Sequence, residues 1–346
     1  MKALVYHGPG RRSWQDFPDP DLIDPTDAVV RVDAVTICGT DLHILKGDVP
    51  EVAPGRVLGH EAVGTVVETG TAVGGLRVGD RVLISCISSC GRCEYCRVGR
   101  YGQCRGGGGW ILGHLIDGVQ AEYVRVPFAD TSTYKLPESV TDEAALLLAD
   151  ILPTSYEVGV LAGRVGPGQS VAVVGAGPIG LAAITTAKLL SPSLIVAIDK
   201  AQARCDAAKS FGADVALEPD ERCVEQVMAA TDGLGVDVAI EAVGVPESFE
   251  LCTRLVRPGG HVANVGVHGK PATLHLEDLW IKDVTITTGL VDTSSTATLL
   301  KMTAAGRFDS GAFVTHRFGL HEMQEAYDVF ERAAETGALK VALFRS

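Results

Sequence analysis

Residues 171–180 read VAVVGAGPIG, and this stretch decides the fold class of the chain. Its three glycines form the pattern G-x-G-x-x-G, which ends an apolar run typical of a strand and opens a helix-like run. Gly175 permits a tight turn, Gly177 lets the backbone approach a pyrophosphate, and Gly180 lets the helix pack closely on the strand. The start of the helix adds free N–H groups and a partial positive charge. The stretch therefore predicts a βαβ unit that binds a dinucleotide.

The end of the next strand-like run indicates which dinucleotide binds. The run LIVAID reaches Asp199, whose carboxylate can accept hydrogen bonds from the ribose hydroxyls of adenosine. A 2′-phosphate would meet a like charge there, so NAD is preferred over NADP. Lys200 and Arg204 lie close enough in sequence to leave some NADP activity possible. The other interpretation of Asp199 is an ordinary turn residue at a strand end.

Strand-like and helix-like runs alternate from residue 153 to residue 293, which is typical of a parallel sheet covered on both faces. Residues 1–152 instead show short Val-rich strands between Gly, Pro and Asp turns, which indicates an irregular all-β domain. The tail, residues 294–346, returns to the mixed pattern of the first domain and is expected to fold back onto it. The predicted class is α/β, with a doubly wound parallel-sheet cofactor domain and a β-rich second domain.

Composition excludes several classes of function. The formal net charge is −13, and no Lys/Arg cluster offsets it, so a nucleic-acid partner is not expected. The first residues, MKALVYHGPGRRSW, lack the apolar core of a signal peptide, and no apolar run is long enough for a membrane span. A cytoplasmic protein is therefore expected, and in a reducing cytosol clustered cysteines indicate metal ligands or redox groups rather than disulfides.

A metal site is predicted in the segment SSCGRCEYCRVGRYGQC, residues 88–104, within a lobe of about residues 88–106. Cys90, Cys93, Cys96 and Cys104 follow the spacing C-x2-C-x2-C-x7-C. Four thiolates satisfy a tetrahedral zinc ion and leave no position for a substrate, so this site is interpreted as structural. An iron–sulfur cluster is the alternative that cysteines alone leave open.

A second group of ligand types lies in CGTDLH and GHEAVG. Cys38 opens the first motif, and His60 and Glu61 stand in the second. Taken singly, Cys38 is a core thiol and His60 a turn histidine. Together they indicate a zinc ion with a thiolate and an imidazole, which needs one more protein ligand and one open position for catalysis.

The sequence resembles the zinc-dependent medium-chain alcohol dehydrogenases. The resemblance covers nearly the whole chain and rests on CGTDLH, GHEAVGTVVETG, VGDRV, the four-cysteine lobe, GAGPIG and VAIDK, in family order. It implies a GroES-like catalytic domain made of both chain ends, a Rossmann domain between them and an active site in the cleft. It also implies two zinc ions per subunit, a small alcohol, aldehyde or ketone as substrate, and a homo-oligomer, with a tetramer favoured over a dimer.

The resemblance further implies roles for individual residues. The third ligand of the catalytic zinc is expected in LLLADILPT, where Asp150 is the candidate, as in bacterial secondary-alcohol dehydrogenases. Glu61 matches a carboxylate that such enzymes can swing onto the metal. Thr40 matches the hydroxyl that first takes the substrate proton, and His43 the group that passes it toward solvent. Asp41 matches the residue that orients the histidine ligand. The plain alternatives are a helix or turn charge for Asp150, and helix capping or surface exposure for Thr40 and His43.

Pocket residues are the least constrained by the motifs. Trp110 aligns with an aromatic pocket wall, Cys86 is taken as a further lining residue, and Leu290 matches a position near nicotinamide; Trp110 and Leu290 could also be core residues. Ligands bind beyond the carboxyl ends of parallel strands, and the residues that follow the later strands are therefore expected near the nicotinamide half. The expected cofactor-binding residues are Gly175, Gly177, Pro178, Ile179, Gly180, Asp199, Lys200, Arg204, Val243, Val265, Gly266 and Leu290.

The function expected from these observations is oxidation of a small primary or secondary alcohol with hydride transfer to NAD, and the reverse reduction. Polyol, threonine and formaldehyde dehydrogenases share the scaffold and are the alternatives within the enzyme class. Polyol and threonine enzymes more often carry Glu as third ligand, which LADIL does not offer. A zinc-less NAD-binding sensor is the alternative from another class, and the presence of Cys38, Thr40 and His60 disfavours it.

Overall fold

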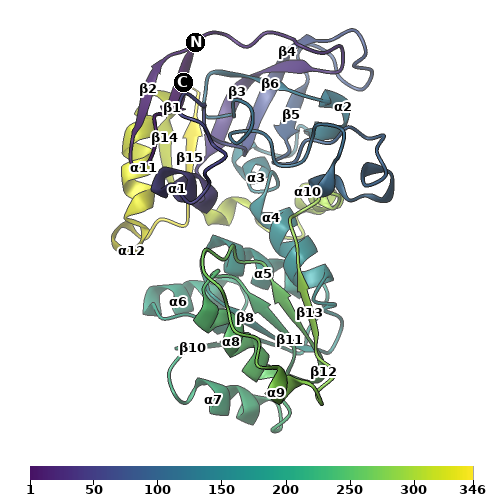
Figure 1. Ribbon diagram of the computed structural model, residues 1–346, viewed down its shortest axis with the longest axis vertical. Coiled ribbons are helices and arrows are strands. Elements are labelled where there is room, and N and C mark those ends of the chain that lie inside the picture. Colours follow the sequence, from purple (N-terminus) through teal and green to yellow (C-terminus); the bar gives the residue numbers. More distant parts are fainter. Residues whose placement is uncertain (346) are drawn as a thin grey trace. The chain divides into compact units, whose positions relative to one another are not determined.

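Two units make up the fold, and a computed structural model describes residues 1–345 of them. The central unit spans Thr154–Val291, and the terminal unit contains residues 1–153 together with the segment that starts at Asp292. The expected domain boundaries, after residues 152 and 293, differ from these junctions by one and two residues. Both ends of the described chain belong to the terminal unit (Figure 1).

The central unit is built on a six-stranded sheet in which all strand pairs are parallel. In spatial order the strands are β10 (Val215–Leu217), β9 (Leu194–Ile198), β8 (Ser170–Val174), β11 (Val236–Glu241), β12 (Val256–Asn264) and β13 (Thr285–Thr288). The order reverses between β8 and β11, which is the switch point of a doubly wound sheet. Most side chains of β8, β9 and β11 are buried, as the apolar runs predicted, and the α/β fold class is confirmed.

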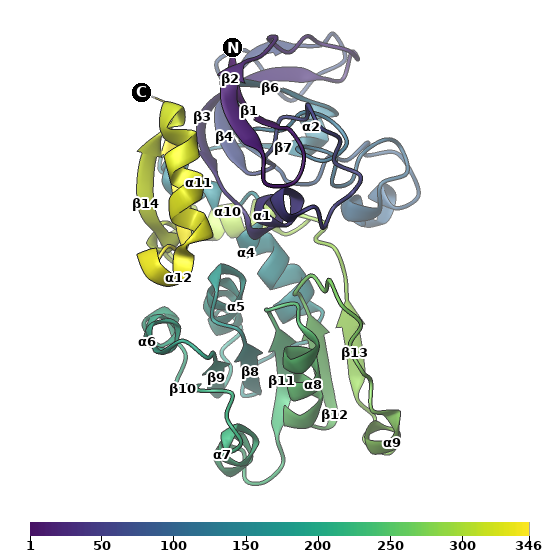
Figure 2. The ribbon, with the colours of Figure 1, turned by 60° about the vertical axis from the view of Figure 1, so that its left-hand side comes forward.

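Helices connect the parallel strands of the central unit (Figure 2). They are α5 (Pro178–Lys188), α6 (Gln202–Phe211), α7 (Cys223–Ala230), α8 (Pro246–Leu255) and α9 (Leu276–Leu279), and the π-helix η3 (Ser155–Leu161) precedes the first strand, β8. Pro178 and Pro246 stand in the first turns of α5 and α8, where proline's missing N–H costs no hydrogen bond. A short loop separates the carboxyl end of β8 from the start of α5.

The terminal unit contains a seven-stranded sheet, a two-stranded hairpin and short helices. The strands of the sheet, along its path, are β14 (Val314–Gly319), β15 (Lys340–Phe344), β3 (Ala28–Thr36), β4 (Ala62–Thr69), β5 (Arg81–Ile84) and β7 (Thr133–Lys135), with β6 (Tyr123–Val126) also paired to β3. The hairpin joins β1 (Lys2–Tyr6) to β2 (Arg12–Asp16). Because β15 pairs antiparallel with β3, the tail of the chain is part of this sheet.

The first part of the terminal unit was expected to be all-β, and this was wrong because it also contains helices. The helices of the terminal unit are α1 (Gly39–Lys46), α2 (Ala129–Ser132), α3 (Asp142–Leu146), α4 (Ile151–Thr154) at the junction, α10 (Thr296–Ala304), α11 (Met323–Glu331) and α12 (Ala333–Thr336), with 3-10 turns at Cys96–Val98, Tyr101–Gln103, Gly311–Phe313 and Leu320–Glu322. Most are too short for a clear helical period in the sequence. The longer α11 packs on β14 and β15 (Figure 1).

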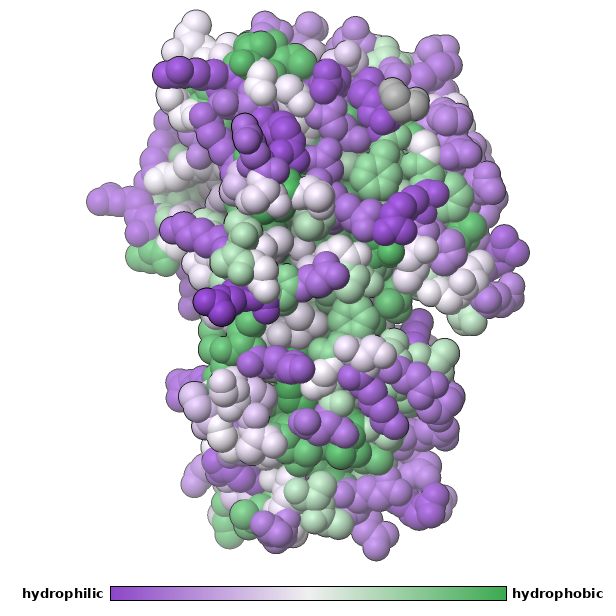
Figure 3. Space-filling model, turned by 180° about the vertical axis from the view of Figure 1, so that it is seen from behind, coloured by the Kyte–Doolittle hydropathy of each residue, from purple (hydrophilic) through white to green (hydrophobic). Residues whose placement is uncertain are grey.

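The surface of both units is mixed in character. On the face drawn in Figure 3, hydrophilic side chains are spread over both units, with hydrophobic residues among them. Among residues 1–345, no helix combines the length and the apolar composition that crossing a membrane requires.

Candidate metal centres and cofactor site

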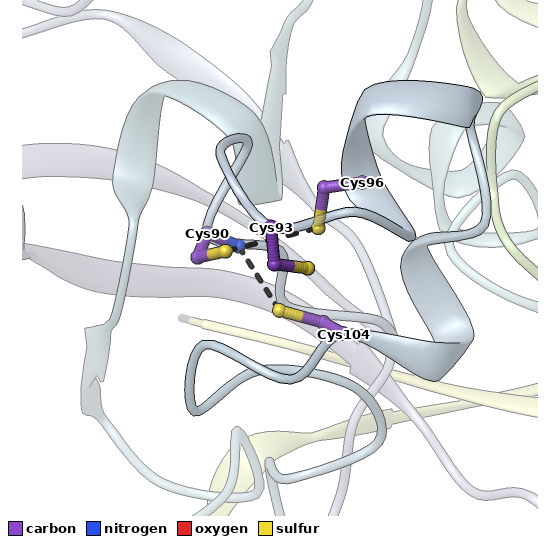
Figure 4. Close-up of side chains that lie close together, drawn as sticks. All are labelled: Cys90, Cys93, Cys96 and Cys104. Carbon is purple, nitrogen blue, oxygen red and sulfur yellow. Dashed lines mark hydrogen bonds between the residues drawn. The ribbon is translucent and has the colours of Figure 1, made fainter.

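The four cysteines of the lobe converge on one point. Their Sγ atoms all lie within 4.8 Å of one another, although the side chains come from loops and from the 3-10 turn Cys96–Val98 (Figure 4). Backbone amides also point at the sulfurs: the N–H of Cys90 lies 3.4 Å from Cys104 Sγ, and that of Arg105 lies 3.5 Å from Cys93 Sγ. Amide donors of this kind stabilise thiolates. The structure therefore brings all four predicted ligands together.

The pKa values of two thiols in this lobe are shifted in opposite directions. Backbone N–H groups of Cys96 and Arg105 lower the pKa of Cys93 to about 6. Burial, and then the neighbouring thiols of Cys93 and Cys104, raise the pKa of Cys96 to about 12. Four thiols this close cannot all ionise without a compensating cation, because each thiolate repels the next. A divalent metal that prefers sulfur removes that conflict, so the donor set fits zinc.

Two glycines that the cysteine spacing did not indicate allow close packing in the lobe. A Cβ at Gly106 would lie 2.4 Å from Cys90 Sγ, and one at Gly108 would lie 2.3 Å from the carbonyl oxygen of Ser88. Any other residue at these positions would displace a sulfur or the backbone. The run RGGGG after Cys104 was the available signal in the sequence.

A second group gathers Cys38, His60, Glu61 and Asp150, each with a donor atom within 4.8 Å of the others. Cys38 is the N-cap of α1, and His60 and Glu61 immediately precede β4. Asp150 lies between α3 and α4. His60 Nε2 is 3.4 Å from Asp150 Oδ2, and Cys38 Sγ is 3.7 Å from the same oxygen. The terminal unit alone thus assembles the three expected ligands and the adjacent carboxylate.

The pKa shifts in this group also indicate that a bound cation would stabilise it. Burial and the charge of Glu61 raise the pKa of the Cys38 thiol. Burial likewise raises the pKa of Glu61, although Lys340 opposes the shift. Burial alone would lower the pKa of His60, but contacts with Asp150 and Cys38 raise it well above its ordinary value. Three acidic groups crowd one buried imidazole, and a thiolate, an imidazole and a carboxylate match the ligands of a catalytic zinc site.

Asp41 contacts different partners from those expected. Its Oδ2 accepts the N–H of Cys38 at 2.8 Å and the side-chain amide of Gln120 at 3.0 Å. Within residues 1–345 it makes no hydrogen bond to His60, so the expected orienting bond to that ring is not seen. Asp41 is the third residue of α1, and its carboxylate is therefore used to accept the N–H of Cys38, the N-cap residue of this helix.

Two further buried residues extend this network. Tyr327 in α11 donates its hydroxyl hydrogen to Gln120 Oε1 at 2.7 Å, and Gln120 in turn bonds to Asp41. Both Tyr327 and Gln120 are fully buried. The C-terminal segment therefore supports the Cys38 loop, which no local motif in the sequence indicated.

The two relay candidates lie on α1, which begins directly after Cys38. Thr40 Oγ1 is 3.7 Å from Cys38 Sγ. His43 is half-exposed, and its Nδ1 lies 2.8 Å from Asp48 Oδ2. Thr40 thus lies beside the proposed ligand Cys38, and His43 reaches solvent. Asp48 is an additional partner that no sequence motif indicated.

The pocket candidates lie beside the same group. The Trp110 ring meets the His60 ring edge-on at 6.2 Å and stacks on His114 at 4.2 Å. Cys86 is buried, and its N–H donates to the carbonyl of Ala149, next to Asp150. Trp110 is partly buried, and it packs against the hydrophobic core of the terminal unit as well as against His60.

The glycine loop of the central unit has the geometry that its sequence predicts. Gly175 has φ +97°, a left-handed conformation, and a Cβ at Gly180 would lie 1.7 Å from the Gly175 carbonyl oxygen. A Cβ at Gly177 would meet nothing within 4 Å, so the space above this residue is open. Gly177 precedes α5, whose first two residues, Pro178 and Ile179, complete the loop. The loop therefore fits a pyrophosphate at a helix N-terminus.

Asp199 directly follows β9 and faces this loop. Its Oδ2 accepts the N–H of Ala176 at 2.8 Å, and its Oδ1 accepts the N–H of Ala201 at 2.9 Å. Arg204 Nη1 lies 3.8 Å from Oδ2, while Lys200 is exposed. Asp199 thus links the glycine loop to the turn after β9. Its bond to Ala201 is the one expected of an ordinary turn residue, and its bond to Ala176 adds the link to the glycine loop.

The remaining cofactor candidates follow successive strands of the central sheet. Val243 follows β11, Val265 and Gly266 follow β12, and Leu290 follows β13. Val243 and Leu290 are 49% and 44% exposed, so neither is a core residue. Glu241, which the motifs did not indicate, is fully buried and accepts the N–H groups of Val243 and Gly244. These residues share the carboxyl edge of the sheet with the glycine loop.

Two family models match the chain. An alcohol dehydrogenase GroES-like domain matches residues 24–138, and a zinc-binding dehydrogenase domain matches residues 178–305. An alcohol dehydrogenase of Cupriavidus necator is 39% identical over 99% of this chain and 98% of the relative. The chain belongs to the zinc-dependent medium-chain alcohol dehydrogenase family. The resemblance inferred from the motifs is therefore confirmed. The GroES-like match lies within the terminal unit, and the zinc-binding dehydrogenase match covers most of the central unit and continues into α10.

Solved structures of the family agree with this fold. The zinc-dependent alcohol dehydrogenase 2 of Streptococcus pneumonia, in its apo form, is 47% identical with a TM-score of 0.96, covering 100% of this chain and 99% of that one. A zinc-binding dehydrogenase of Sinorhizobium meliloti bound to NADP is 30% identical with a TM-score of 0.87, covering 99% and 98%. Among family members with another named activity, the L-threonine 3-dehydrogenase of Pyrococcus horikoshii is 35% identical over 93% of this chain and 92% of the relative.

Proposed function

We propose that this protein oxidises a small primary or secondary alcohol to the aldehyde or ketone with NAD, and catalyses the reverse reduction. Membership of the family makes it an oxidoreductase that acts on alcohols. The observation that carries the proposal is the convergence of Cys38, His60 and Asp150 in one buried group. A zinc ion held there would lower the pKa of the substrate hydroxyl, and NAD would accept the hydride.

The chain's own residues would then handle the proton. Thr40, 3.7 Å from the Cys38 sulfur, is placed to accept the hydroxyl hydrogen of an alcohol bound beside this group. His43 would pass it to water, because its ring is half-exposed and Asp48 holds Nδ1, leaving Nε2 for solvent. Trp110 would form one wall of the substrate pocket beside His60, and Cys86 would line it near Asp150.

We propose two zinc ions per subunit and NAD rather than NADP. The four-cysteine lobe would hold the second, structural zinc, because it offers four donors and no substrate position. Asp199 supports NAD, since its carboxylate lies at the glycine loop where a 2′-phosphate would be repelled. Arg204 lies near enough to that carboxylate to permit a residual NADP rate.

A homo-oligomer is also part of the proposal, with the free edge of the central sheet as the contact. Among the described residues β13 pairs only with β12, so its other edge is open. Beside it Trp280 is 75% exposed and Ile281 is 70% exposed. An open strand edge flanked by exposed apolar side chains suits a second copy of the chain. We also propose a cytoplasmic location, because four cysteines converge as metal ligands, a use of cysteine that suits a reducing compartment.

The experiment that tests this function is a substrate screen followed by absorbance of the reduced cofactor. Primary and secondary alcohols, polyols and L-threonine are each offered with NAD and with NADP, and zinc is counted by elemental analysis. Two zinc ions, with turnover of simple alcohols and a preference for NAD, are expected. Turnover confined to polyols or L-threonine, a preference for NADP, or a protein without zinc would contradict the proposal.

A further inference from the structure

The indole ring of Trp110 contacts two imidazole rings of the terminal unit. It meets the ring of the proposed ligand His60 edge-on, with the ring centroids 6.2 Å apart and the ring planes at 79°. It stacks on the ring of His114, with the centroids 4.2 Å apart and the planes at 19°. A side chain that packs against a second ring has fewer rotamers open to it than one held by a single contact. His114 therefore limits where the indole ring can lie beside His60.

His114 is itself oriented by a hydrogen bond to the backbone of Trp110. Its Nδ1 donates to the carbonyl oxygen of Trp110 at 2.9 Å, because a carbonyl group can only accept. The other ring nitrogen, Nε2, is buried and has no hydrogen-bond partner among residues 1–345. One backbone bond thus sets the direction of the imidazole ring, and the face of that ring is available to the indole.

The turn that carries His114 packs directly on the residue before His60. Three successive N–H groups of this turn donate to the carbonyl oxygen of Ile111 at 2.9–3.2 Å. A Cβ at Gly113 would lie 2.6 Å from the carbonyl oxygen of Gly59 and 2.7 Å from its nitrogen. Only glycine lets two backbone segments approach this closely. The position of His114 is therefore fixed relative to His60, and not only relative to the indole ring.

We propose that His114 is a positioning residue: it fixes the Trp110 ring and thereby sets the width of the substrate pocket beside His60. This inference rests on the proposed function, in which Trp110 forms one wall of that pocket. A ring that cannot turn aside excludes substituents larger than the space it leaves, whereas a mobile ring would yield to them. The pocket therefore selects alcohols whose reacting carbon carries small alkyl groups.

A purely structural role for His114 is the competing explanation, because Trp110 also packs against the hydrophobic core of the terminal unit. If the core alone held the indole, loss of the His114 ring would lower stability and leave the choice of substrate unchanged. If His114 holds the indole, its loss releases the ring and admits larger alcohols. Substrate selectivity thus distinguishes the two explanations.

The test is His114→Ala in the full-length protein, assayed with NAD on 1-phenylethanol and 2-propanol, or on benzyl alcohol and ethanol if only primary alcohols are oxidised. We expect the ratio of kcat/KM for the aryl alcohol over the alkyl alcohol to rise at least about tenfold, with unchanged zinc content. His114→Phe keeps a ring that can stack and should return the ratio toward that of the wild type. The matched control is His321→Ala, which removes an exposed imidazole elsewhere in the terminal unit and should leave the ratio unaltered.

A second measurement needs neither metal, cofactor nor turnover. The chain has three tryptophans, so in a Trp14→Phe/Trp280→Phe background the fluorescence comes from Trp110. Quenching of this fluorescence by acrylamide reports how accessible the indole ring is. We expect quenching to increase in His114→Ala and to stay at the level of the background protein in His114→Phe and His321→Ala.

A further variant keeps the test decisive if His114→Ala does not fold. His114→Gln retains a donor for the Trp110 carbonyl and removes the ring, and it should show the same rise in the ratio and in quenching. An unchanged ratio in the folded variant without the ring, or an equal rise in His114→Phe, would overturn the inference. Failure of the proposed function is distinguishable, because wild-type protein would then oxidise no simple alcohol, while quenching would still show whether His114 fixes the indole.

Discussion

His60 Nε2 lies 3.4 Å from Oδ2 of Asp150, although the two residues are far apart in the chain. The contact arises because His60 precedes β4 and Asp150 follows α3, and α3 packs against β3 and β4. A sulfur, an imidazole and a carboxylate therefore meet inside one unit, without any contribution from the central sheet.

Replacement of Asp150 by Ala should remove zinc from this group and leave the lobe zinc in place. Loss of the carboxylate leaves Cys38 and His60, since both oxygens of Glu61 are paired with Lys340, and two protein ligands are too few to retain the metal. We expect one zinc ion per subunit by elemental analysis and a fall in kcat/KM of at least about 100-fold. Asp278→Ala, at an exposed acidic site of the central unit, is the control. Normal turnover with both zinc ions in Asp150→Ala would rule out Asp150 as a ligand.

Substitution of Cys93 by Ser should empty the lobe and spare the chemistry. Three thiols hold zinc far less tightly than four, and the loop around them would lose its main restraint. The expected result is one zinc ion fewer, a lower Tm, and kcat within a few-fold of wild type in freshly prepared protein. Cys205→Ala, outside both metal groups, should keep both zinc ions. Retention of the full zinc content in Cys93→Ser would refute the assignment.

Conversion of Asp199 to Asn should shift the cofactor preference toward NADP. The change removes the negative charge and retains one oxygen to accept an N–H from Ala176 or Ala201. We expect the ratio of kcat/KM for NADP over NAD to rise at least about tenfold, since Arg204 remains nearby. Asp206→Asn on α6 provides the control. An unchanged ratio would mean that Asp199 does not select the cofactor.

Replacement of Tyr327 by Phe should destabilise the terminal unit by about 1–3 kcal/mol, because Gln120 Oε1 would lose its donor in a fully buried position. Thermal and denaturant unfolding measure the change. Tyr95→Phe, at a 39% exposed position in the lobe, should leave stability unaltered. Equal stability of Tyr327→Phe and wild type would show that this hydrogen bond adds nothing to the fold.

The lowered pKa of Asp237 predicts that the contribution of this residue to stability depends on pH. Burial by itself would raise the pKa of Asp237, but hydrogen bonds from the Ser170 amide, the Arg257 side chain and the Ser170 hydroxyl lower it below the ordinary 3.8. A lowered folded-state pKa contributes stability above pH 3.8 that is lost as the pH falls through the folded-state value.

We therefore expect Asp237→Asn to unfold at a lower temperature than wild type at pH 7, with the difference shrinking as the pH drops below about 4. Differential scanning calorimetry between pH 7 and pH 3 measures it, and Asp278→Asn serves as the control. A difference that stayed constant over this range would contradict the assigned pKa direction.

The sequence by itself determined the features that depend on near neighbours in the chain. The glycine loop, the four-cysteine spacing and the alternation of apolar strands with helices are local patterns, because turn geometry and burial impose them within a few residues. Cys38, His60 and Asp150 were also found, but the choice of Asp150 came from a family resemblance rather than from any local constraint.

Only the tertiary structure decided what supports these motifs. The pairing of β15 with β3 brings Lys340 to Glu61, and the packing of α11 brings Tyr327 to Gln120. Asp41 turned out to bond to Cys38 and not to His60. These contacts join residues that are distant in sequence. A polar group can be buried when it has a hydrogen-bond partner in space, and its neighbours in the chain do not reveal that partner. The physical reason is that strand pairing and helix packing, which act over the whole chain, select these partners.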